Sequence, residues 1–250
     1  MKIRVFKTSE ELGKAAADYA AEVLKRAIRE KGRARLVLST GASQFDTLKA
    51  LVKQDVDWSK VEMFHLDEYI GLPESHPASF RKYLKERFVN LINLKKAHFI
   101  DGEGNIEKCI GQLTEEIKKE PVDLALIGIG ENTHLAFNDP PADFDTRESF
   151  IVVELDEDCK KQQVGEGWFD TLDYVPKKAV TMTVHQIMQS NVIISCVPYK
   201  AKAKAIKLTL ENELTNMIPS TMLKRHKDCT LFIDEDSASL TDKNLLVKYM

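Results

Sequence analysis

The chain has 250 residues, a formal net charge of -3 and 43% apolar residues, which is ordinary for a globular protein. A chain of this length can bury a sizeable core as one α/β domain without disulfides. The near-neutral charge argues against a nucleic-acid-binding protein, which would carry a basic stripe, but it is compatible with a local basic site for a phosphate.

The cysteines and the N-terminal segment indicate the compartment. The four cysteines are far apart in the sequence and form no CxxC pair, so neither a zinc knuckle nor a thioredoxin-like motif is expected. Sparse cysteines are typical of a reducing compartment. The N-terminus shows no apolar signal-peptide core, and no apolar stretch approaches the ~18 residues of a membrane span. We therefore expect a cytoplasmic protein.

The first expected elements are a short strand and a long amphipathic helix. Ile3–Phe6 has the composition of a strand, and the segment from Thr8 to Glu11 resembles a capping box that starts a helix. Apolar residues then recur at helical spacing, and Gly32 is the expected stop of this helix.

Strand-like and helix-like segments alternate through the rest of the chain. Further strands are expected at Ala34–Ser39, Val61–Leu66, Val122–Ile129, Phe150–Leu155, Val180–Thr183, Asn191–Val197 and Thr230–Ile233. Further helices are expected at Phe45–Leu51, Ser79–Leu91, Ile106–Lys118, Val184–Met188 and Ala201–Leu210. This alternation predicts an α/β fold, with a doubly wound, mostly parallel sheet covered by helices on both faces, as in Rossmann-like proteins.

The domain organisation is simple. No internal repeat, low-complexity tract or linker divides the chain, so we expect a single domain over residues 1–250. Two longer excursions, residues 139–147 and 160–173, interrupt the alternation of strands and helices. They predict a lid around residues 139–173.

Sheets of this type bind ligands at the carboxyl ends of their strands, and three segments of interest lie there. The first is a turn between a strand and a helix, formed by Thr40, Gly41, Ala42 and Ser43. Small residues allow main-chain N–H groups to approach an anion, and two hydroxyls add donors. No GK[ST] follows, so the turn is not a P-loop. An ordinary strand–helix turn fits the same residues equally well.

The second segment ends the strand Val61–Leu66 with two adjacent acids, Asp67 and Glu68. A carboxylate at this position can serve as a general base. A turn or helix-capping acid is an equally good interpretation of the dipeptide alone.

The third segment runs from Gly128 to Pro140 and places glycines directly after an apolar strand. It fails as a dinucleotide fingerprint, because Thr133 occupies the third glycine position. The same loop contains His134 and Asp139, and a histidine paired with a carboxylate suits proton transfer near neutral pH. A lone histidine is more often structural.

Taken together, these segments resemble the glucosamine-6-phosphate deaminase/isomerase family, which shares its fold with 6-phosphogluconolactonase. The resemblance lies in LDEYIGLPESHPASF, GIGENTHLAFNDP, STGAS with FDTLKAL, YVPKKAVTMTV and KAKAIKLTLE, which follow in the family's order over nearly the whole chain.

The resemblance implies roles for individual residues. Thr40–Ser43 would wrap a 6-phosphate, and Lys202 would add a point charge to it, although Lys202 also fits one solvated lysine among several. Asp67 would move a proton between C2 and C1, and His134, aided by Asp139 and the neighbouring Asn132, would open the sugar ring. Glu68 and Gly130 are expected in the substrate site. The implied activity is aldose–ketose isomerisation with deamination of a hexosamine 6-phosphate, without metal or organic cofactor, in a homo-oligomer.

The chain also departs from the family pattern. Asn132 and Thr133 replace the Asp-Gly that precedes the histidine in many members, and Asp139 replaces a longer glutamate. A substrate-contacting arginine expected before Trp168 is absent. These changes leave the aminosugar open, with galactosamine 6-phosphate as one choice.

Two other functions stay open at this point. The first is a 6-phosphogluconolactonase-type hydrolase, because a shared fold does not decide between the two chemistries. That relative usually has arginine where this chain has Tyr69, which favours the deaminase. The second is a sugar-phosphate-binding protein without catalysis, an alternative motivated by Asn132.

Overall fold

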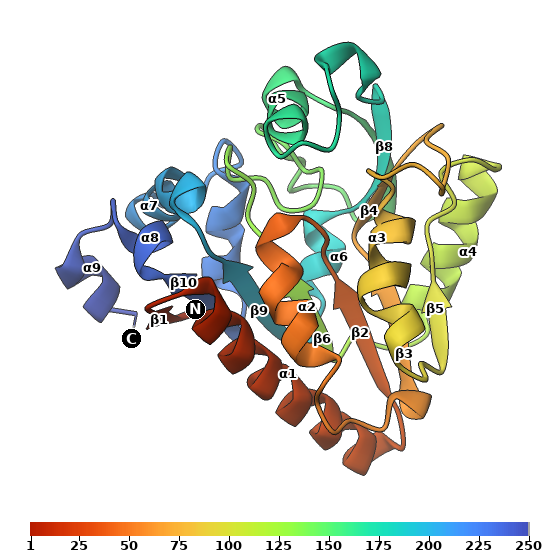
Figure 1. Cartoon of the computed structure of the whole chain (residues 1–250), viewed down its shortest axis with the longest axis horizontal. Coiled ribbons are helices and arrows are strands. Elements are labelled where there is room, and N and C mark those ends of the chain that lie inside the picture. Colours follow the sequence, from red (N-terminus) through yellow and green to blue (C-terminus); the bar gives the residue numbers. More distant parts are fainter. Residues whose placement is uncertain (250) are drawn as a thin grey trace.

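A seven-stranded parallel sheet forms the centre of the computed structural model, which describes residues 1–249 (Figure 1). Its strand order is β1-β10-β9-β6-β2-β3-β5, and every neighbouring pair is parallel. The strands span β1 Lys2–Phe6, β2 Ala34–Leu38, β3 Val61–His65, β5 Lys96–His98, β6 Leu124–Ile127, β9 Val192–Val197 and β10 Cys229–Asp234. The predicted doubly wound fold is confirmed.

Helices cover both faces of this sheet. One face carries α1 Ser9–Lys31, α2 Phe45–Leu51 and α3 Phe80–Arg87, which lie in front of the strands in Figure 1. The opposite face carries α4 Ile106–Lys118, α6 Val184–Met188, α7 Ala203–Glu211, α8 Glu235–Ala238 and α9 Lys243–Val247. Strand β2 shows the two-sided burial directly, because Leu36 and Leu38 pack in the first layer whereas Val37 packs in the second. None of the helices within residues 1–249 is long and apolar enough to cross a membrane.

A second, three-stranded sheet sits beside the main one and was not predicted. It consists of β4 Asp67–Tyr69, β8 Lys178–Met182 and β7 Phe150–Glu154, all antiparallel. Strands β7 and β8 were expected at nearly these positions, but their separate sheet follows from pairing with β4, which is too short to recognise from its sequence. Helix α5 Glu157–Gly165 packs over this sheet through a small apolar cluster that includes Tyr69, Phe137 and Phe169.

Local signals set the ends of the first helix as expected. The Thr8 hydroxyl accepts a hydrogen bond from the Glu11 N–H at 3.2 Å, and Gly32 ends α1 in the left-handed conformation with φ 73°. The Glu11 carboxylate reaches back one residue further than a capping box requires, to the N–H of Lys7.

The order of the strands determines where a ligand can bind. From β2 the chain continues outward through β3 and β5, and then returns to place β6 on the other side of β2. The junction of β2 and β6 is therefore the topological switch point, where crossover connections diverge and leave a crevice at the strands' carboxyl ends. The loops that follow β2 and β6 are two of the three segments selected from the sequence.

Close packing of α1 on α2 yields the first prediction. A Cβ added at Gly13 would lie 2.7 Å from the main-chain carbon of Asp46, so Gly13→Ala should force the helices apart and destabilise the protein by about 1–3 kcal/mol. The matched control is Gly111→Ala in α4, where a Cβ meets no atom within 4 Å and a gain of up to ~1 kcal/mol is expected. Urea unfolding measures both variants, and an unchanged Gly13→Ala midpoint would contradict the close approach.

Candidate active site

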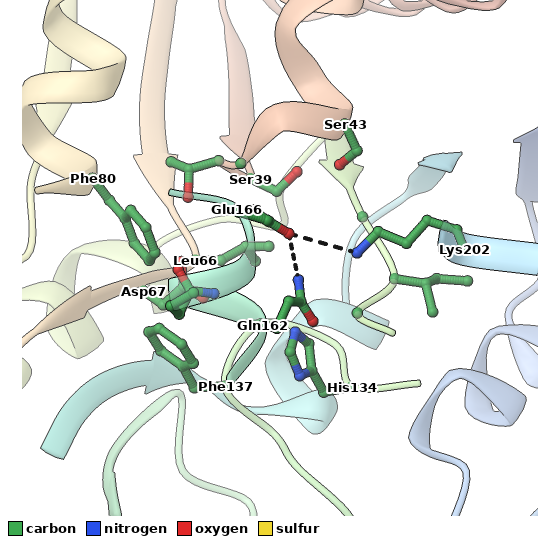
Figure 2. Close-up of a pocket in the computed structure, with 17 residues that line it drawn as sticks. Ser39, Ser43, Leu66, Asp67, Phe80, His134, Phe137, Gln162, Glu166 and Lys202 are labelled. Atoms are coloured by element: carbon green, nitrogen blue, oxygen red, sulfur yellow. Dashed lines mark hydrogen bonds and ion pairs between the residues drawn. The ribbon is translucent and has the colours of Figure 1, made fainter. Parts of the chain in front are cut away.

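A cavity of about 70 Å³ opens at the carboxyl ends of the strands (Figure 2). Its polar lining comes from the turn after β2, the start of β4, the loop after β6, helix α5 and the segment before α7. These polar and glycine residues are Ser39, Thr40, Gly41, Ser43, Asp67, Gly128, Gly130, His134, Gln162, Gln163, Glu166 and Lys202. The cavity therefore joins all three segments selected from the sequence.

The turn after β2 is fixed from both sides. Gly41 has φ 98°, a conformation that glycine adopts without steric cost. Its carbonyl accepts a hydrogen bond from the Tyr83 hydroxyl at 2.9 Å. The Gln44 amide donates to the carbonyl of Cys196 on β9 at 3.1 Å and so ties the turn to the neighbouring part of the sheet. Thr40, Gly41 and Ser43 line the cavity, whereas Ala42 does not.

Asp67 presents a carboxyl group to the cavity with only 7% of the residue exposed. Burial raises its pKa well above the ordinary value, and the charges of Glu68 and Asp139 raise it further. Within residues 1–249 no hydrogen bond to this carboxyl group offsets these effects. A carboxylate with a raised pKa and a free face is a stronger base than an ordinary aspartate.

His134 lies across the cavity and is held by Asp139. Its Nδ1 is 2.8 Å from Asp139 Oδ1, and the Asn132 amide donates to the same oxygen at 2.9 Å. Burial by itself would raise the pKa of Asp139, but the hydrogen bonds from His134 and Asn132 and the charge of the imidazole hold it below its ordinary value. Asp139 therefore stays ionised behind the ring, as a proton-transfer histidine requires.

The loop around His134 is shaped to bring the ring down onto the main chain. A Cβ at Gly130 would lie 2.2 Å from Nε2 of His134, so only glycine fits beneath the imidazole. Thr133 has φ 77°, an uncommon value for a branched residue. The glycine and the constrained backbone set the ring orientation that Figure 2 shows, with the imidazole directed into the cavity.

Glu68 has a different place from the one expected. It is fully buried and does not line the cavity. Its carboxylate accepts hydrogen bonds from the Ser79 hydroxyl and from the main-chain N–H groups of Tyr69, Phe80 and Arg81, and it pairs with the Arg81 guanidinium. Glu68 therefore fastens the segment before α3 to β4. The expected contact between Glu68 and substrate does not fit this arrangement.

Several lining residues were not selected from the sequence. Gln162 and Gln163 come from α5, and Glu166 follows its last turn. Ser39, the first residue of the STGAS motif, directly follows β2, and its hydroxyl has no hydrogen-bond partner within the described chain. Gln162 and Glu166 are four residues apart and thus share one helix face, a signal that was available. Lys202, which was selected from the sequence, lines the cavity, and the residue is 6% exposed.

Comparison with known proteins identifies the family. Residues 7–232 match the family model described as glucosamine-6-phosphate isomerases/6-phosphogluconolactonase. The chain belongs to the glucosamine-6-phosphate isomerase/6-phosphogluconolactonase family.

Relatives of known name cover nearly the whole chain. A glucosamine-6-phosphate deaminase of Thermoanaerobacter sp. (strain X514) is 37% identical, with 96% of this chain and 95% of the relative covered. One of Lactobacillus delbrueckii subsp. bulgaricus is 33% identical, with 96% and 99% covered. A solved monomeric glucosamine-6-phosphate deaminase is 30% identical with a TM-score of 0.87 over 96% and 100% of the chains. A solved 6-phosphogluconolactonase of Shewanella baltica, 19% identical with a TM-score of 0.77 over 94% and 97%, shows the same fold.

Two clusters among the described residues of this member of the glucosamine-6-phosphate isomerase/6-phosphogluconolactonase family have the residue types of a metal site, and the one that includes His134 lies at the cavity. His134, Asp139 and Cys159 place one ligand-type atom each within 4.8 Å of one another. Burial strongly raises the pKa of the Cys159 thiol, so it stays protonated, whereas metal ligation requires a thiolate. The Asp139 oxygen nearest the ring is already engaged by His134 and Asn132. This cluster is better suited to orienting the imidazole than to holding an ion.

The buried carboxyl group of Asp67 yields a prediction on stability. Its folded-state pKa is raised, so ionising it costs folding free energy as the pH rises above the unfolded-state value of about 3.9. Asp67→Asn removes this cost, and at pH 7 we expect a gain of about 1–2 kcal/mol, or roughly 2–8 °C in Tm. The gain should disappear near pH 3.5, where the group is protonated in both states. Asp55→Asn at an exposed position is the control, and a loss of stability in Asp67→Asn at pH 7 would contradict the burial argument.

The anchoring role of Glu68 yields a second prediction on stability. Glu68→Ala leaves the buried Arg81 guanidinium without its innermost partner, and we expect a loss of about 3–5 kcal/mol in urea unfolding. Glu103→Ala removes a half-exposed partner of the same arginine and should cost no more than ~1 kcal/mol. Equal losses of unfolding free energy in the two variants would show that the buried Glu68–Arg81 pair stabilises the protein no more than the exposed Glu103–Arg81 pair.

Proposed function

We propose that the protein isomerises and deaminates a hexosamine 6-phosphate, converting glucosamine 6-phosphate or a close aminosugar analogue into a ketose 6-phosphate and ammonia. One observation carries the proposal. A free carboxyl group, Asp67, and an imidazole held by a carboxylate, His134, face the same small cavity, and its far end holds a buried ammonium group, Lys202. The named relatives support the same activity.

His134 opens the sugar ring in the proposed mechanism. Its Nε2, on the side of the ring away from Asp139, takes the proton of the C1 hydroxyl and returns a proton to the ring oxygen as the bond from C1 to that oxygen breaks. C1 becomes an aldehyde. Asp139 stabilises the imidazolium formed in between, because its charge lies 2.8 Å from Nδ1.

Asp67 then acts on the open chain. Its carboxylate removes the C2 proton, and the electron pair forms the C1–C2 double bond of an enolamine as the π bond of the C1 carbonyl breaks and its oxygen takes a proton from water. Return of a proton to C1 gives a C2 iminium group, and water adds to C2 as ammonia leaves. The raised pKa of Asp67 makes its carboxylate a stronger base for removing the C2 proton, and the carboxyl group so formed holds that proton for delivery to C1. We propose that these steps need no metal or organic cofactor.

The phosphate anchors the substrate away from the reacting carbons. Thr40, Gly41 and Ser43 offer main-chain and hydroxyl donors, and Lys202 offers a charge. Ala42 contributes as part of the turn, and Gly130 supports the imidazole. Binding energy from the remote phosphate fixes the orientation of C1 and C2 between Asp67 and His134.

The remaining proposals concern the surroundings of the site. We place the protein in the cytoplasm, and we propose that residues 139–173 serve as its lid. The homo-oligomer expected from the resemblance also stays a prediction, and the structural relative described above is a monomer.

Ammonia release from glucosamine 6-phosphate and galactosamine 6-phosphate tests the proposal. Asp67→Asn and His134→Asn should each lower kcat by about 10²–10⁴-fold, because each removes one proton-transfer group. His185→Asn, which changes a histidine outside the cavity, should leave kcat unchanged.

Two outcomes would overturn the deaminase proposal. The first is hydrolysis of 6-phosphogluconolactone above the spontaneous rate with no ammonia release, which would identify a lactonase. The second is tight binding of hexosamine phosphate in calorimetry without turnover, which would identify a binding protein.

A further inference from the structure

The lid places a carboxylate inside a cavity proposed for a phosphate. Glu166 follows α5, and its side chain points toward Lys202 in Figure 2. Both of its oxygens are held by lid residues. The Gln162 amide donates to Oε1 at 2.7 Å, and the Trp168 indole N–H donates to Oε2 at 3.1 Å. The carboxylate is therefore positioned in the cavity by its own segment.

This carboxylate faces the ammonium group assigned to the phosphate. Glu166 Oε1 lies 3.9 Å from Lys202 Nζ, and the lysine side chain is 8% exposed. Among the described residues, Glu166 is the one acid in ion-pair contact with Lys202. A buried ammonium group requires a nearby negative charge, and here the lid supplies it.

The Glu166 carboxylate takes up space at the Lys202 end of a small cavity. The cavity volume of about 70 Å³ is far below the ~300–1,000 Å³ of ordinary small-molecule sites. A phosphate next to Lys202 would also lie beside the Glu166 charge, and like charges at short range in a site of low dielectric repel strongly. A phosphate and the ionised Glu166 therefore compete for Lys202.

We propose that Glu166 is a specificity-determining residue, an internal anion that occupies the phosphate end of the empty cavity and that a phosphate monoester must displace from Lys202. The inference rests on the function proposed above. A phosphate dianion carries more charge than the carboxylate and can replace it, and the lid segment then moves outward with Glu166. An amino sugar without a phosphate cannot displace Glu166 from Lys202, so this arrangement favours phosphorylated substrates.

Trp168 provides a direct signal of the displacement. Its indole N–H donates to Glu166, so its fluorescence should change when the carboxylate leaves. The other of the two tryptophans, Trp58, packs against Phe88 in the core, outside the residues that line the cavity. Trp168→Phe separates the two signals.

Inorganic phosphate is the probe for the test. Glu166→Gln keeps the shape of the side chain and removes its charge, so this variant should bind phosphate at least ~10-fold more tightly than the wild type in calorimetry, a difference of about 1.4 kcal/mol. The KM for glucosamine 6-phosphate should fall by a similar factor with kcat within about twofold, because the change acts on binding alone. Glu166→Ala removes the same charge without introducing an amide, and its phosphate affinity and KM should match those of Glu166→Gln.

Controls separate this inference from the proposed function. Glu157→Gln, at an exposed position on the same helix, should bind phosphate as the wild type does. Lys202→Met should lose most phosphate binding, with or without Glu166→Gln. Phosphate should change the fluorescence of the wild type and leave that of Trp168→Phe unchanged.

Three results would overturn the inference. Phosphate binding to Glu166→Gln that equals the wild type, with normal ammonia release, would remove the role of Glu166 and leave the proposed function standing. Weaker binding and a raised KM would show that Glu166 contacts the substrate instead. No phosphate binding to either protein would reject the phosphate site itself, and the proposed function with it.

Discussion

The pairing of β2 with β6 fixes the relative positions of the two loops on which the site depends. The N–H of Ser39, at the end of β2, donates to the carbonyl of Leu126 on β6 at 2.9 Å, and each strand then leads directly into its loop. Because the chain leaves β2 toward one edge of the sheet and β6 lies on its other side, no crossover covers the space above the pair. The Thr40–Ser43 turn and the His134 imidazole reach the same cavity as a consequence of strand order.

Burial gives the side chains in this space their chemical character. It raises the pKa of Asp67 and lowers the pKa of Lys202, so both groups are less easily ionised than in water. Keeping either group ionised therefore costs folding free energy, and the apolar cores on the two faces of the main sheet offset this cost. Burial raises the pKa of Glu68 as well, but its carboxylate, unlike that of Asp67, accepts hydrogen bonds from several donors and pairs with Arg81. Two neighbouring acids thus have opposite roles, and only one of them faces the cavity.

Much of the site could be predicted, because its residues follow directly after strands. Asp67, His134 and the Thr40–Ser43 turn were selected for that reason, and the resemblance to the family added Lys202. Gln162 and Glu166 were missed because α5 has no marked apolar face, so their i,i+4 spacing placed them on one face of the helix without indicating that this face turns inward. Glu68 was misplaced because a dipeptide does not reveal which of two consecutive side chains points to the cavity.

By itself, the sequence determined the class of fold, the helices with clear caps and apolar stripes, and the family of the protein. These properties depend on local periodicity and on motifs that are contiguous in the chain. Only the tertiary structure decided that β4 leaves the main sheet to pair with β8, that Glu68 turns toward Arg81, and that Glu166 meets Lys202. Each of these depends on contacts between segments far apart in sequence, and such contacts are set by how the layers pack.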